Sequence, residues 1–109
     1  MTGLELTRTG DGDTVRLSLR GELDIASAGR LEDALAEIEA LTYQQLVIDL
    51  RGLDFMDSTG LRIILGADAR ARVAGRTVTV VRGSDAVTRL FRITGLDERL
   101  TIVDAPATV

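Results

Sequence analysis

Apolar and polar residues alternate along this chain with two different periods, and the change of period marks the expected strands and helices. In the first twenty residues, apolar side chains recur at every second position, which is typical of a strand with one buried face. The segments Leu4–Arg8 and Thr14–Leu19 flank the turn sequence Gly10–Asp13. The chain is therefore expected to begin with a β-hairpin.

Helical periods follow the hairpin. Between Ser27 and Leu41, apolar residues are spaced three or four apart, which predicts an amphipathic helix. Its expected buried face consists of Leu31, Leu35, Ile38 and either Leu41 or Thr42. A second helix is predicted from Ser58 to about Val73 and ends at Gly75. A third is predicted to begin at Ser84 as its N-cap and to end at Gly95 in a left-handed conformation.

Short apolar, β-branched segments separate these helices. Strands are predicted at Leu46–Leu50, Arg76–Arg82 and Leu100–Val103. Strands that alternate with helices favour a mostly parallel sheet, so the expected fold is a small α/β sandwich that opens with an antiparallel hairpin. A chain of 109 residues suits a single domain, with a core over about 4–103 and a frayed tail over 104–109.

Composition excludes several kinds of chemistry. The formal net charge of −4 argues against direct binding to nucleic acid. The sequence has no cysteine and no histidine, which excludes disulfides, the usual zinc ligand sets and a histidine-activated nucleophile, and all 13 basic residues are arginine. No apolar run is long enough to span a membrane, and the N-terminus does not resemble a signal peptide. We therefore expect a cytoplasmic protein without a cofactor or metal.

The most informative motif is Asp57-Ser58-Thr59-Gly60. It follows the predicted strand Leu46–Leu50 and a short acidic segment, and it opens the second predicted helix. Asp57 or Ser58 can cap this helix, because the first backbone N–H groups of a helix lack intrahelical partners. The same free N–H groups and the positive end of the helix dipole would favour a phosphate.

With its surroundings, this motif resembles the STAS domain of bacterial anti-anti-sigma factors, the anti-sigma factor antagonists of sporulation and stress response. The matching segments are Gly21–Ser27, Asp49–Leu61 and Arg89–Leu96, in the family's order. In that family the serine of this motif is phosphorylated, which maps onto Ser58. Thr59 is the alternative acceptor.

The resemblance implies a ligand and kinase substrate, not an enzyme. The unmodified protein would bind an anti-sigma factor that is itself a serine kinase, and would thereby free a sigma factor for transcription. Phosphorylation of Ser58 would release the anti-sigma factor, and a serine phosphatase would reverse the modification. The antagonist would be a monomer or a weak dimer.

Loops at one edge of the sheet are expected to form the contact surface. The predicted partner-binding residues are Asp24, Asp54, Met56, Asp57, Ser58, Thr59 and Gly60. Some also have simpler roles: Asp24 can cap the first helix, Asp57 can stabilise the start of the second, and Asp54 can be a solvated loop residue. We expect Phe55 in the core and Met56 exposed as an adaptable anchor.

Other interpretations remain. A second apolar face of the second helix, carrying Ile63 and Ala67, could dock a partner or pack against a neighbouring helix. A STAS domain could instead be a scaffold or a ligand-sensing module of another complex. A response-regulator receiver with Asp49 or Asp54 as phosphoacceptor is disfavoured by the absence of lysine, and a hydrolase using Ser58 by the absence of histidine.

Overall fold

The computed structural model describes residues 3–104, so most of the expected frayed tail, residues 105–109, lies outside the described part. Its elements follow the predicted order of strands and helices. They are β1 (Leu4–Asp11), β2 (Thr14–Leu23), α1 (Ala28–Glu39), β3 (Gln45–Met56), α2 (Ser58–Val73), β4 (Thr77–Val81), α3 (Asp85–Thr94), the 3₁₀ helix η1 (Leu96–Glu98) and β5 (Thr101–Val103).

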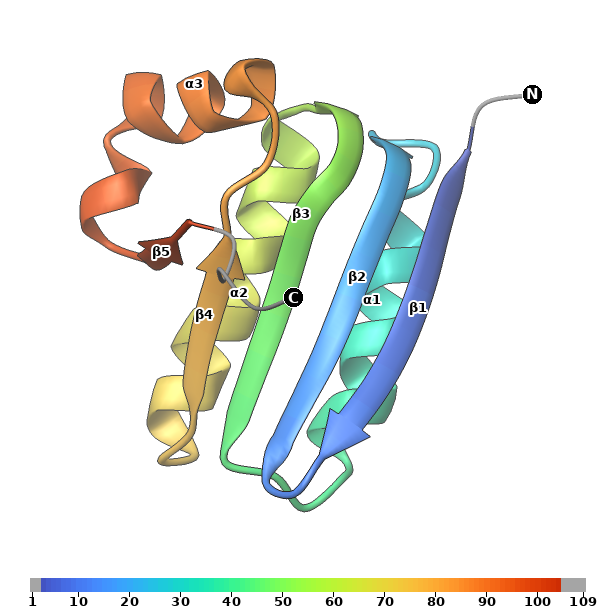
Figure 1. Ribbon diagram of the computed structural model, residues 1–109, viewed down its shortest axis with the longest axis vertical. Helices are drawn as coiled ribbons and strands as arrows, with labels where there is room; N and C mark the ends of the chain where they lie inside the picture. The colour runs from blue at the N-terminus through green and yellow to red at the C-terminus, as the bar shows by residue number, and fades with distance from the viewer. Residues whose placement is uncertain (1–2, 105–109) are drawn as a thin grey trace.

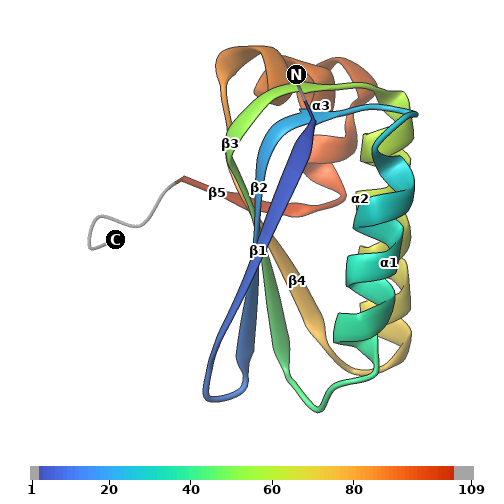
Figure 2. The same cartoon turned by 90° about the vertical axis from the view of Figure 1, so that its right-hand side faces the viewer.

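The strands form one sheet in sequential order, β1-β2-β3-β4-β5. β1 and β2 are antiparallel, and each of the other neighbouring pairs is parallel. α1 and α2 lie side by side on one face of the sheet, and α3 lies near the end at which β3 finishes (Figures 1 and 2). The structure confirms the predicted mixed, mostly parallel α/β fold.

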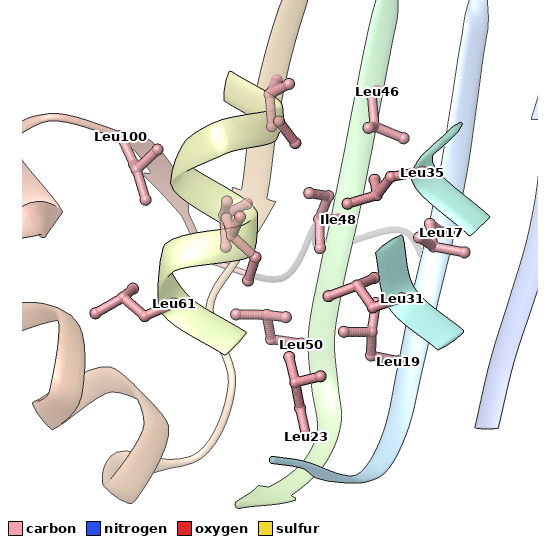
Figure 3. Packing of buried hydrophobic residues seen from close by; sticks show 14 of the residues in the cluster. Leu17, Leu19, Leu23, Leu31, Leu35, Leu46, Ile48, Leu50, Leu61 and Leu100 are labelled. Carbon is pink, nitrogen blue, oxygen red and sulfur yellow. The ribbon is translucent and has the colours of Figure 1, made fainter. Parts of the chain in front are cut away.

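Aliphatic side chains fill the space between the sheet and the two long helices (Figure 3). The predicted buried face of α1 is confirmed at Leu31, Leu35 and Ile38. The prediction is wrong for the last position of this face, because α1 ends at Glu39 and Leu41 is exposed. Tyr43 is buried in the same core.

The second apolar face of α2 faces its neighbour helix. Ala67 is buried and Ile63 is half-buried against the core. α1 packs against α2, so of the two interpretations the structure favours helix packing over a free docking face.

β3 is longer than predicted and contains the segment expected to be an acidic loop. It continues past Leu50 to Met56, and the loop prediction for this segment is wrong. The reason is that β2 also continues to Leu23, which pairs with Met56 in register. Two register shifts interrupt this part of the β2–β3 ladder. The long strands carry the motif to the end of the sheet.

The third helix has the predicted termini. The Ser84 hydroxyl accepts a 3.3 Å hydrogen bond from the backbone N–H of Val87, and Gly95 has a φ of +74°. Among the described residues, none of the helices has the length and apolar character needed to cross a membrane.

Candidate functional site

The motif lies where β2 and β3 end and α2 begins, at the upper end of the sheet in Figure 1. The backbone N–H of Asp57 donates a 3.2 Å hydrogen bond to the carbonyl of Leu23, the last residue of β2. Asp24 follows Leu23 and Ser58 follows Asp57. The two loops expected to form one surface therefore start from a single backbone contact.

Asp57 is the N-cap of α2. Its backbone is extended, and its Oδ1 accepts hydrogen bonds from the N–H groups of Thr59 at 2.9 Å and Gly60 at 3.2 Å. The sequence allowed either Asp57 or Ser58 as the N-cap, and in the structure the N-cap is Asp57. The carboxylate therefore already occupies two of the N–H groups expected to be free for a phosphate, and that expectation is wrong for this conformation.

Ser58 is the first residue of α2, and its side chain is exposed. Within residues 3–104 its hydroxyl makes no hydrogen bond, so it has no capping role to lose. Thr59 is half-buried. Of the two candidate acceptors, Ser58 is the more accessible to another protein.

Gly60 has a packing role. A Cβ atom at this position would lie 2.6 Å from Cγ and Cδ2 of Leu23 and 3.0 Å from Cγ of Met56. Real Cβ atoms do not approach neighbours so closely, so a glycine here lets the first turn of α2 rest on the ends of β2 and β3. Gly60 is itself buried and positions Ser58 at the rim.

The two apolar residues before the motif have the opposite exposure from that predicted. Met56 is 6% exposed and belongs to the core, whereas Phe55 is 47% exposed. Met56 pairs with Leu23 beneath the start of α2, and Phe55 pairs with Glu22 and points outward. The prediction of an exposed methionine anchor and a buried phenylalanine is wrong, since β3 continues as a strand through both residues.

Asp24 holds the turn between β2 and α1. Its Oδ1 accepts hydrogen bonds from the N–H groups of Ala26 at 3.0 Å and Ser27 at 3.1 Å. The Ser27 hydroxyl donates to the carbonyl of Glu22 at 3.0 Å. Asp24 therefore forms the turn before α1 but does not cap the helix, because the N-cap is Ser27 and no side chain among residues 3–104 caps it; the capping role expected for Asp24 is wrong. Because its side chain is half-buried, one side stays open to solvent.

The same turn presents a residue that sequence reasoning missed. Ile25 is 79% exposed, next to Asp24 and two residues beyond the end of β2. A large aliphatic residue in a short polar connection was the signal that could have identified it. Ile25 and Phe55 extend from neighbouring strand ends, and Asp54 is exposed beside Phe55. The edge is thus acidic and carries two exposed apolar side chains.

Asp49, the other carboxylate considered as a phosphoacceptor, does not belong to the edge around Ser58. It is 5% exposed within β3, and it pairs with Arg51 at 2.7 Å and Arg16 at 3.1 Å. Burial raises the pKa of Asp49, but hydrogen bonds from Arg51 and the charges of both arginines outweigh burial, so the pKa lies below its usual value. The carboxylate is held inside the strand by cations and is not presented at a strand end as a phosphoacceptor.

Comparison with known proteins agrees with this architecture. The family model described as "Mlab, STAS domain" matches residues 6–104. This chain belongs to the STAS domain family. The resemblance and the fold expected from the sequence are thereby confirmed.

Relatives of this STAS domain carry regulatory names. It is 34% identical over 92 residues to an anti-sigma-B factor antagonist of Listeria monocytogenes, covering 84% of this chain and 81% of that one. It is 35% identical over 82 residues to the anti-sigma-F factor antagonist RsfB of Mycobacterium tuberculosis, covering 75% and 66%. A crystal structure of an anti-sigma factor antagonist from Mycobacterium paratuberculosis superposes with a TM-score of 0.87 at 26% identity, covering 94% and 87%. All three carry the name of an anti-sigma factor antagonist.

Proposed function

We propose that this STAS domain is an anti-sigma factor antagonist whose binding is controlled by phosphorylation of Ser58. The observation that carries the proposal is the exposed Ser58 hydroxyl at the first position of α2, with the capping role taken by Asp57. A kinase can therefore modify Ser58 without removing a hydrogen bond from the fold. The names of the Listeria and Mycobacterium relatives support the antagonist role.

The proposed partner is an anti-sigma factor with serine kinase activity. The unmodified domain binds it and frees a sigma factor for transcription; the phosphorylated domain releases it, and a serine phosphatase restores binding. Resemblance to the antagonist family supplies these partners. The domain itself acts as ligand and substrate, with no direct contact to nucleic acid.

We place the contact surface at the strand edge around Ser58. Asp24, Asp54 and Asp57 make this edge acidic, and Ile25 and Phe55 supply exposed apolar area. Buried apolar side chains contribute most of the energy of typical interfaces, whereas charged neighbours steer the approach of the partner. A partner with an apolar recess and a basic rim would complement this edge. Met56 and Gly60 contribute from beneath it by packing.

Peptide analysis of the protein isolated from its native cells tests the proposal. We expect one phosphate on Ser58. Labelling by the anti-sigma factor kinase and ATP should disappear in Ser58→Ala and persist in the control Ser18→Ala, a serine within β2. Undiminished labelling of Ser58→Ala would move the acceptor to another hydroxyl, with Thr59 the first to examine.

A further inference from the structure

A cavity of about 160 Å³ lies between α3 and the two strands β4 and β5. It shares no residue with the proposed contact surface around Ser58. Three of its lining residues are apolar, Val80, Phe91 and Ile102, and we call them the apolar side. Three others are charged, Arg82, Arg92 and Asp97, and we call them the charged side.

The size of the cavity indicates what its apolar side can hold. Val80 and Phe91 are buried in the core, and Ile102 is half-buried against it. An apolar protein cavity of roughly 150 Å³ accommodates one benzene ring. The space beside these three side chains therefore suits a ring or a short branched chain and is too small for a nucleotide.

The charged side favours an anion. Arg82 pairs with Asp104 at 3.5 Å, and both side chains are well exposed, so this ion pair contributes little. Arg92 makes no ion pair with any residue from 3 to 104. With Asp97 and Asp104 counted, the charges of the two arginines are balanced, so the attraction for an anion comes from Arg92, the arginine without an ion-pair partner among residues 3–104. Arginine binds carboxylates through paired, charge-assisted hydrogen bonds.

The position of the cavity in the fold also suits a ligand. Arg82 directly follows the last residue of β4, and Ile102 lies in the neighbouring parallel strand β5. Ligands of open α/β sheets bind at the carboxyl ends of parallel strands. Here α3 covers that end and supplies Phe91 and Arg92 from one helical turn.

We propose that this cavity binds a small organic anion, a carboxylate on an apolar body of about one ring. The ring lies against Val80, Phe91 and Ile102, and the carboxylate accepts hydrogen bonds from Arg92 and Arg82. Asp97 disfavours a second negative charge, so a monoanion fits better than a dianion. The site is independent of phosphorylation at Ser58.

Three probes separate the two halves of this site. Benzoate has both the ring and the charge, benzamide has the ring alone, and acetate has the charge alone. In ¹H–¹⁵N spectra of the full chain, benzoate should shift the amides of Val80, Thr88, Phe91 and Ile102 with millimolar affinity. Benzamide and acetate should each bind about tenfold more weakly, because each loses one set of contacts.

A pair of variants tests the charged side. Arg92→Gln should weaken benzoate about tenfold and remove its advantage over benzamide. Arg89→Gln makes the same change of charge on the same helix at an exposed residue outside the cavity, and should bind benzoate as the wild type does. Equal affinity for benzoate and benzamide, unchanged binding by Arg92→Gln, or no shifts at the four amides with tens of millimolar benzoate would each overturn the proposal.

Discussion

The N–H of Asp57 and the carbonyl of Leu23, 3.2 Å apart, join the start of α2 to the end of β2. Through this contact, Asp24 and Ser58 each lie one residue from the same hydrogen bond. A change at the first turn of α2 therefore acts next to the β2–α1 turn, although the two segments are more than thirty residues apart in the sequence.

Replacing the helix cap should destabilise the domain. Asp57→Ala removes the acceptor of two backbone N–H groups, and loss of such a cap costs about 0.5–2 kcal/mol. Urea unfolding followed by circular dichroism measures the change. Asp54→Ala, one of the exposed neighbours, should change the free energy of unfolding by less than about 0.5 kcal/mol.

Two glycines of α2 should respond in opposite directions to alanine. Gly60→Ala places a methyl group 2.6 Å from Leu23 and should destabilise the domain by about 1–3 kcal/mol. At Gly66, the new methyl group would meet only the flexible end of Arg70, so alanine should stabilise the helix by about 0.5–1 kcal/mol. Thermal unfolding of both variants checks this. A neutral Gly60→Ala would show that α2 does not rest on the strand ends as described.

Exposed apolar residues near Ser58 should matter for partner binding and not for folding. Phe55→Ala and Ile25→Ala should each weaken capture of the anti-sigma factor by about 1–3 kcal/mol, as large apolar residues at an interface centre do. The matched control is Ile93→Ala on α3, because Ile93 is 74% exposed and Ile25 is 79% exposed. Titration calorimetry with the purified partner gives the affinities, and wild-type affinity in both test variants would remove them from the interface.

Because of Asp49, the free energy of unfolding should depend on pH in the acid range. The pKa of Asp49 in the folded state is lowered by Arg51 and Arg16 despite burial, so the unfolded chain takes up a proton first as the pH falls. The stabilisation is complete above the unfolded pKa of about 3.9 and is lost as the pH falls through the lower folded value. Asp49→Asn should cost about 1–3 kcal/mol at pH 7.

The difference between Asp49→Asn and the wild type should shrink below pH 4, when measured by urea unfolding at pH 7 and pH 3. Asp33→Asn, an exposed carboxylate on α1, is the control and should cost less than about 0.5 kcal/mol at pH 7. An equal cost of Asp49→Asn at both pH values would contradict the role assigned to its charge.

Periodicity was sufficient to predict the fold, because one face of each helix and most strands pack in a single core. The order of elements, the buried positions Leu31, Leu35 and Ile38, and the caps at Ser84 and Gly95 follow from local pattern alone. The end of β3 does not follow from the local pattern. Its last residues include Gly52 and Asp54, which are residue types depleted in strands, so their pairing with β2 comes from tertiary contacts that local propensity does not show.

The candidate site, like the fold, could be predicted only in part from the sequence. The position of Ser58 at a helix start could be inferred from four residues, because capping chemistry is local. The exposure of Phe55 and Met56 could not, since it depends on which strand face remains after two register shifts. The exposure of Ile25 is not shown by any period in the sequence, because a single aliphatic residue in a short connection belongs to no repeating apolar pattern.

Phosphorylation of Ser58 should abolish partner binding while leaving the fold nearly unchanged. A phosphoserine carries roughly −1.5 to −2 charges and is worth about 0.3–1 kcal/mol at a helix N-terminus. Here the neighbouring Asp57 carboxylate, which already occupies the N–H groups of Thr59 and Gly60, offsets part of that gain. The phosphorylated protein should therefore melt within about 5 °C of the unmodified form.

The same phosphate charge should strongly weaken binding, although it hardly changes the stability of the fold. An unpaired charge buried against a partner costs on the order of 2–5 kcal/mol, which weakens binding by roughly thirtyfold to several thousandfold. Ser58→Glu should be a weaker mimic, because it adds only one charge, and Ser58→Ala should still bind. Calorimetry with the anti-sigma factor and thermal melts of the same four samples test both halves. A large fall in melting temperature, or amide shifts far from α2, would mean that phosphate acts by rearranging the fold instead of by blocking the surface.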